Sequence, residues 1–390
     1  MVPNGWNRIA LEKIAEVRSG VAKGKKGLKA PIEVPYLRVA NVQDGHVDLT
    51  EVKTIEIEQD KLERYSLKYG DVLMNEGGDY DKLGRGDVWL GQIEPCLHQN
   101  HVFAVRPNQD IIDSFFLAAL AASNYGKTYF LSCAKRSTNL ASINSTQIKE
   151  FPVLVPPLPE QKKIAQILST WEKAITTTEQ LLAKSQQQKK ALMQQLLTGK
   201  KRLLDKNGVR FSGEWKRVEL GDLLDYQQPT PYLVESTDYS DDFSTPVLTA
   251  GKTFILGYTD EESGIFSEKL PAIIFDDFTT DSKFVDFPFK AKSSAMKILT
   301  AKEGVSIKYV YEAMQLLDFS VGGHQRHWIS IYSRLVTPFP GSEEQQKIAA
   351  VLSTADKEIS ALQQKLEAIK QEKKALMQQL LTGKRRVLVS

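Results

Sequence analysis

Apolar residues recur at alternating steps of four and three positions in two stretches of the chain, residues 160–204 and 344–388. This spacing is the a/d pattern of a heptad repeat and predicts helices with one apolar stripe. Neither stretch contains proline or glycine before Gly199 or Gly383, which stand where a helix C-cap is expected. The apolar residues of this seam are Ile164, Leu168, Trp171, Ile175, Leu182, Leu192 and Leu196 in the first copy, and Ile348, Leu352, Ile359, Leu362, Leu366, Ile369, Leu376 and Leu380 in the second.

The two stretches are copies of one another, with 27 of 45 positions identical at a constant offset of 184 residues. The first predicted helix, Leu158–Leu197, is 40 residues long, or ~60 Å at about 1.5 Å per residue. A lone helix must bury its stripe, and the nearest matching stripe is the other copy, so we expect the two helices to pair. The alternative is that each helix packs on its own globular neighbour. Lys189 and Lys373 interrupt the seam at equivalent positions, where a polar residue can fix the register.

The repeat divides the chain into two globular segments that alternate with the two helices. We expect head 1 at residues 1–155, a helix at 156–205, head 2 at 206–342 and a helix at 343–390. Both heads open on a similar motif, at Trp6 and Trp215, and the short runs that follow are typical of strands. The predicted strands are 36–42, 52–57 and 102–105 in head 1, and 247–248, 254–258 and 272–275 in head 2. Each head then has one apolar helix, 111–122 or 306–317, followed by a polar loop, 135–139 or 322–327. The fold class is therefore α+β, with an internal repeat and two separate heads.

Composition excludes some classes of protein but indicates no particular chemistry. With 42% apolar and 25% charged residues, the chain is typical of a globular protein. Its longest apolar run, Phe115–Ala122, is far too short to cross a membrane, which takes about 20 residues. The two cysteines, Cys96 and Cys133, do not make a disulfide framework, so we expect a reducing, cytoplasmic setting.

The residues that begin and end each long helix carry a family resemblance. The run Pro156-Pro157-Leu158-Pro159-Glu160-Gln161, the end Leu196-Leu197-Thr198-Gly199 and the second, weaker copy are similar to the conserved regions of DNA specificity subunits of type I restriction-modification systems. Pro35–Val42, Asn75–Asp79, Gly84–Gly86 and Gln99–His101 resemble parts of a target-recognition domain in that family.

The resemblance implies that each head is a target-recognition domain reading one half of a split site in double-stranded DNA. It implies that the two helices form an antiparallel coiled coil that sets the spacer and docks methyltransferase (modification) subunits, to which restriction subunits are added. It also implies no catalysis in this chain. Partner subunits of the family use S-adenosylmethionine, ATP and Mg²⁺, so we expect no cofactor here. The face rich in Gln and Lys, residues 186–190 with Gln194 and Gln195, is the expected docking surface.

Charge bears on how DNA is held. Residues 1–155 carry no net charge and residues 206–340 carry a net charge of minus five, whereas a protein that coats DNA non-specifically has basic globules. Contacts must therefore come from local patches, which a specific reader combines with base contacts. A coiled-coil scaffold with two protein-binding heads is the alternative function.

Candidate DNA-binding residues lie in loops that suit phosphate or base-edge contacts. Lysines in a glycine-containing loop suit phosphates, and Arg, Asn and Gln in the loops after the apolar helices can bond to base edges. The candidates are Lys23, Lys25, Lys26, Lys29, Asn75, Asn100, Lys135, Arg136, Asn139, His324, Gln325, Arg326 and His327.

Three catalytic or metal motifs are set aside. Residues 20–26 lack the spacing and the Ser or Thr of a P-loop. His98 with His101, and His324 with His327, have no cysteine pair beside them to complete a zinc site, so no metal is expected. No catalytic constellation is present, which places any chemistry on partner subunits.

Overall fold

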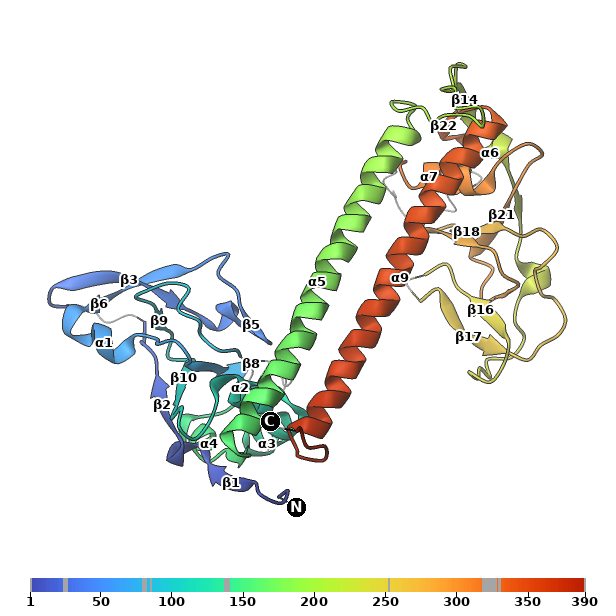
Figure 1. Ribbon diagram of the computed structural model, residues 1–390. Helices are drawn as coiled ribbons and strands as arrows, with labels where there is room; N and C mark the ends of the chain where they lie inside the picture. The colour runs from blue at the N-terminus through green and yellow to red at the C-terminus, as the bar shows by residue number, and fades with distance from the viewer. Residues whose placement is uncertain are drawn as a thin grey trace. The chain divides into compact units, whose positions relative to one another are not determined.

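The computed structural model describes residues 2–23, 27–78, 83–84, 86–136, 141–251, 253–317, 328 and 331–388. Contacts divide the chain into unit 1, residues 1–179 with 365–390, and unit 2, residues 180–364. Each unit contains one head and the adjoining ends of both long helices, α5 (Leu158–Leu196) and α9 (Ser342–Leu380). Both helices are labelled in Figure 1. Their bounds agree with the heptad pattern, and Gly199 and Gly383 cap them with φ angles of 73° and 67°.

Head 1 is built from small sheets with helices packed on them, and its strands pair antiparallel except β3 with β9, which are parallel. A two-stranded ribbon joins its first and last strands, β1 and β13, and Asn7 lies opposite Val155. The strands are β1 (Asn7–Ala10), β2 (Ala15–Ser19), β3 (Pro31–Leu37), β4 (Val42–Gln43), β5 (His46–Val47), β6 (Lys53–Glu58), β7 (Val72–Asn75), β8 (Gly77–Gly78), β9 (Leu97–His98), β10 (Val102–Pro107), β11 (Lys135–Arg136), β12 (Ala141–Ser142) and β13 (Pro152–Val155). Their sheet orders are β2-β10-β7, β6-β3-β9, β11-β12-β8 and β4-β5. The α-helices are α1 (Leu62–Tyr65), α2 (Ser114–Ala122), α3 (Asn124–Cys133) and α4 (Ser145–Lys149).

Head 2 repeats the ribbon but carries a larger sheet. Here β14 pairs with β22. Four strands form the main sheet in the order β15-β21-β18-β19, and three more form a second sheet in the order β17-β16-β20. The strands are β14 (Lys216–Glu219), β15 (Leu224–Gln227), β16 (Thr245–Leu248), β17 (Ile255–Thr259), β18 (Ala272–Asp276), β19 (Ser282–Val285), β20 (Lys290–Ala291), β21 (Met296–Ala301) and β22 (Val336–Phe339). The helices are α6 (Leu220–Leu223) and α7 (Ile307–Met314).

Three predicted element boundaries in head 1 are wrong for local reasons. The strand expected to reach Val42 ends at Leu37, because buried Asn41 closes a 3-10 turn by accepting from Arg38 N at 2.9 Å. The helix expected from residue 111 begins at Ser114, because the Asp113 side chain caps it by accepting from Phe116 N. Lys135 and Arg136, expected in a loop, form strand β11.

The long helices bury their seams in two ways, and both expected modes of packing occur. At the helix ends the seam joins a head: Ile164, Leu168 and Leu380 belong to the core of unit 1, and Leu196 and Leu352 to that of unit 2. Between these ends ion pairs join one helix to the other, and the seam residues are half-buried except Ile175, which is 7% exposed. Two helices alone cannot enclose a seam on all sides, which explains the difference.

Candidate nucleic-acid interface

The pairing of α5 and α9 is antiparallel within each unit. In unit 1, Glu172 pairs with Lys373 and Glu179 with Lys370, so partner numbers fall as α5 numbers rise. In unit 2, Lys189 Nζ lies 2.6 Å from Asp356 Oδ1, and Ser185 donates to Glu358 at 2.9 Å. Lys189 and Lys373 therefore both meet a carboxylate, from equivalent residues of the two copies.

The Glu-Gln pair that starts each helix is an anchor for the adjoining head. Glu160 is 3% exposed and accepts from Trp6 Nε1 at 3.2 Å and from two nitrogens of Arg386 at 2.6 and 2.7 Å. Glu344, 2% exposed, has the same three bonds, from Trp215 Nε1 and Arg202. We call each Trp–Glu–Arg group an anchor cluster. Because the arginine follows the other helix copy, each cluster closes a head onto both helices.

The glutamine of the motif ties the same helix start to the rest of the head. Gln161 is fully buried; its amide donates to Ile111 O and Pro156 O, and its oxygen accepts from Asp113 N. Gln345 repeats two of these bonds, with Pro340 O and Ser306 N. The motif that carried the resemblance is thus a structural joint between head and helix.

Four segments that are distant in sequence converge in head 1. Strand β8 pairs with β12, whose other neighbour is β11, so Gly77–Gly78 lies in one sheet with Lys135–Arg136. Glu76 N donates to His101 O at 2.9 Å, which brings the 99–101 turn to the same place. That turn holds the loop before Lys23, since Asn100 N donates to Val21 O at 3.0 Å. We call this group, Lys23, Glu76, Asn100, His101, Lys135 and Arg136, the head 1 loop cluster.

Most of the described candidates are accessible side chains of this cluster. Lys23, Lys135 and Arg136 are exposed and Asn100 is half-buried, while Lys29 is exposed nearer the start of β3. Lys23 also lies over the Tyr36 ring at 5.7 Å. Lys25, Lys26, Asn139, His324, Gln325, Arg326 and His327 lie outside the described residues.

Asn75 does not fit the DNA-binding role that was expected of it. It is 1% exposed, and its amide donates to Val42 O at 2.9 Å inside the core. The sequence around Asn75 is typical of a loop, whereas Asn75 is the last residue of the buried strand β7. Glu76 and His101 hold the accessible positions instead. From the sequence both are weaker candidates, because turns commonly hold such residues for backbone bonding.

Comparison with known proteins identifies this architecture. Residues 3–186 match the model of the type I restriction modification DNA specificity domain. The chain is 29% identical over 416 residues to the putative MjaX specificity subunit of Methanocaldococcus jannaschii, covering 99% of this chain and 95% of that protein. The first half of the chain thus matches the DNA specificity domain of type I restriction-modification systems, and the whole chain is similar to a specificity subunit of that family.

Two other specificity subunits are similar to the chain over part of its length or in fold. The EcoR124I/EcoR124II specificity subunit of Escherichia coli is 50% identical over 158 residues, which are 39% of this chain and 38% of that subunit. The S subunit from M. genitalium has a TM-score of 0.65 at 12% identity, with 97% of both chains covered. This solved structure confirms the fold.

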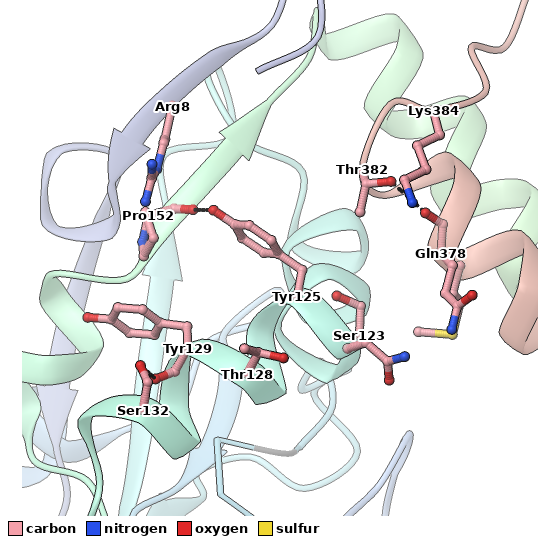
Figure 2. Close-up of a pocket in the computed structure, with 12 residues that line it drawn as sticks. Arg8, Ser123, Tyr125, Thr128, Tyr129, Ser132, Pro152, Gln378, Thr382 and Lys384 are labelled. Carbon is pink, nitrogen blue, oxygen red and sulfur yellow. Dashed lines mark hydrogen bonds between the residues drawn. The ribbon is translucent and has the colours of Figure 1, made fainter. Parts of the chain in front are cut away.

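A separate cleft of about 500 Å³ lies in unit 1, where the ribbon, α3 and the end of α9 meet (Figure 2). Arg8 and Lys384 line it, and none of its twelve lining side chains is acidic. Tyr125 OH donates to Pro152 O at 2.6 Å and Tyr129 OH donates to Gln147 O at 2.8 Å, so both hydroxyl protons are already used. Burial raises the pKa of Tyr125, with Arg8 acting against it. The cleft therefore presents two cations and favours an anionic group.

Among the described residues, no group of three His, Cys, Asp or Glu side chains is placed to hold a metal ion. His98 is 2% exposed, and burial lowers its pKa to about 4 despite its contact with Val102 O. It is thus a neutral core residue. Within the described part of the chain, no helix is both long and apolar enough to cross a membrane.

Proposed function

We propose that this chain reads a bipartite sequence in double-stranded DNA as the specificity subunit of a type I restriction-modification complex, with no catalysis of its own. Head 1 reads one half-site and head 2 the other. The observation that carries the proposal is the head 1 loop cluster, because it gathers cationic side chains for phosphates and polar side chains for base edges at one place. The similarity of the whole chain to a specificity subunit supports the same function for head 2 and does not favour a protein-binding scaffold.

The two long helices serve as spacer and as assembly platform in this proposal. Each is 39 residues long, or ~58 Å at about 1.5 Å per residue. The anchor clusters couple each head to both helices, so a change in helix length alters the unread middle of the site and leaves the half-sites as they were. Modification subunits dock on the exposed face that includes Gln186–Gln188, Lys190, Gln194 and Gln195. Lys189 is not available for docking, because it pairs with Asp356 and Glu312.

The cationic cleft is a second contact for a modification subunit, through acidic side chains of that partner. Arg8 and Lys384 come from the first strand and from the end of the second helix copy, so a partner bound there touches head and helix together. Restriction subunits then join the complex. S-adenosylmethionine, ATP and Mg²⁺ belong to these partners, and the complex works in the cytoplasm.

The test is reconstitution with the modification subunits encoded beside this gene. The complex should methylate one split motif, and its DNA affinity should fall with salt on a log–log line whose slope counts the phosphates contacted. A complex that binds all duplexes equally, or that binds none, contradicts the proposal. Motif mapping across the host genome, with and without the gene, identifies the two half-sites.

A further inference from the structure

The backbone of Glu76 is held on both sides within the head 1 loop cluster. Its N–H donates to His101 O at 2.9 Å, and its carbonyl accepts from Ile143 N at 2.8 Å. The next residue, Gly77, pairs closely with its neighbour, since a Cβ there would lie 3.0 Å from Ala141 O, a shorter distance than most Cβ contacts. The backbone on both sides of Glu76 is therefore held by two other segments, and the place where its side chain emerges is set by the fold.

The side chain of Glu76 is also oriented. Its carboxylate accepts from His101 Nδ1. In a neutral imidazole that donates from Nδ1, Nε2 is an acceptor. Asn100 Nδ2 lies 3.4 Å from that Nε2, at the limit of a hydrogen bond. The Glu76 side chain is 30% exposed and that of His101 is 55% exposed. Asn100, His101 and Glu76 thus form a short polar chain that ends at an accessible carboxylate.

An oriented carboxylate beside cations has a narrow use at a DNA surface. It offers only acceptors, about four lone-pair sites, and one bond to His101 leaves acceptor capacity. It repels phosphates, whose contacts fall to Lys23, Lys135 and Arg136. In the major groove the base-edge donors are the N6 amino group of adenine and the N4 amino group of cytosine, whereas guanine and thymine present acceptors there.

We infer that Glu76, held by His101, is a specificity-determining residue of head 1 that accepts a hydrogen bond from the exocyclic amino group of adenine or cytosine. The inference rests on the proposed function, because it assumes that the head 1 loop cluster faces DNA. It differs from a structural role, in which the Glu76–His101 pair only stabilises the turn. A structural pair affects stability and leaves base preference unchanged.

The experiment selects bound duplexes from a pool in which both half-sites are randomised, with the parent complex and with variants. In the parent, one position of one half-site accepts adenine or cytosine and excludes guanine and thymine. Glu76→Gln keeps the shape but adds an amide donor, so it should admit guanine or thymine there with discrimination reduced about tenfold. The other half-site and the spacer should stay unchanged. Glu63→Gln, at an exposed position on α1, is the matched control and should select the parent motif.

Each other outcome has a defined meaning. If Glu76→Gln selects the parent motif with undiminished discrimination, or changes several positions in both half-sites, the inference is wrong while the proposed function stands. If the parent complex selects no motif, the proposed function fails. If the complex with Glu76→Gln binds no duplex, the selection is repeated with His101→Gln, which removes the imidazole and keeps Glu76. A change at that single position then supports the inference, and an unaltered motif overturns it.

Discussion

Arg386 holds Glu160 through two parallel hydrogen bonds of 2.6 and 2.7 Å, although 226 residues separate them in sequence. The bond closes unit 1, because Glu160 begins α5 and Arg386 follows α9. The guanidinium also lies over the Trp6 ring at 5.7 Å, and Trp6 bonds to the same carboxylate. A fork of this geometry is specific to arginine.

Arg386→Ala should destabilise unit 1 by about 2–3 kcal/mol. The substitution leaves the buried Glu160 carboxylate with Trp6 as its remaining donor among those found, and a buried charge without its partner is costly. The value lies below the range for fully buried pairs because the Arg386 side chain is 44% exposed. Urea unfolding, monitored by tryptophan fluorescence, measures this loss in the free energy of unfolding. Arg385→Ala at the exposed neighbouring position should be near neutral, and adding Glu160→Gln to Arg386→Ala should recover part of the loss.

Lys189→Met and Lys373→Met should differ in cost although the two lysines are equivalent in the repeat. Lys189 lies beside Glu312, whose side chain is fully buried, and Asp356, whereas Lys373 pairs with Glu172, which is 42% exposed. Removing Lys189 leaves Lys308 to balance both carboxylates, and we expect a loss of about 2 kcal/mol or more. Removing Lys373 should change the free energy of unfolding by less than about 1 kcal/mol. Paired denaturation curves test this order, and equal losses would contradict it.

The heptad pattern predicts both long helices, the first to within a residue, because their periodic stripe is a local signal of the sequence. The contacts that join helix and head are not local. Nothing in the sequence indicates that Arg202 and Arg386 bond to Glu344 and Glu160, because each pair combines residues from opposite ends of two repeats. The resemblance located the Glu-Gln motif, but its role as a joint became visible only with its partners in place.

The candidate site was predictable in kind but not residue by residue. Lys23, Asn100 and Arg136 belong to the head 1 loop cluster, yet only pairing among β8, β12 and the 99–101 turn brings their segments together. Asn75 and Glu76 are adjacent, and one is in the core while the other is accessible. Asn75 is buried because strand β7 ends there, and Glu76 is accessible because it follows the strand. A sequence rich in turn residues does not indicate where the strand ends.

Lowering the pH from 6.5 to 4 should destabilise unit 1 through His98. Burial lowers the pKa of folded His98 from 6.5 to about 4, so in this window the unfolded chain binds a proton that the folded chain does not. The stability is therefore complete above pH 6.5 and is lost as the pH falls, by about 3 kcal/mol in total. His98→Gln keeps a donor for Val102 O and does not titrate. The difference in unfolding free energy between parent and variant should shrink as the pH falls from 6.5 to 4. A difference that does not change with pH would contradict the lowered pKa of His98.

Reversing both charges in the cationic cleft should weaken assembly with modification subunits. In Arg8→Glu with Lys384→Glu, carboxylates replace the cations that attract acidic partner side chains, and we expect at least about a tenfold rise in the dissociation constant. Analytical ultracentrifugation or surface plasmon resonance measures it at two salt concentrations. Lys13→Glu with Arg385→Glu has the same total charge at exposed positions outside the cleft. Equal weakening by both pairs would show a general charge effect and no role for the cleft.

Lengthening both helices by one heptad should lengthen the spacer and preserve both half-sites. The residue numbers of Glu172 with Lys373 and of Lys189 with Asp356 each add to 545, so the midpoint of the antiparallel register lies between Gln180 and Leu181 and between Gln364 and Lys365. Seven residues inserted at both points keep every existing pair in register and add ~10 Å of helix, or about three base pairs. Methylation mapping should show the parent half-sites with the longer spacer. An insertion in one helix alone breaks the register on one side and should abolish methylation, whereas altered half-sites in the double insertion would exclude a spacer role for the helices.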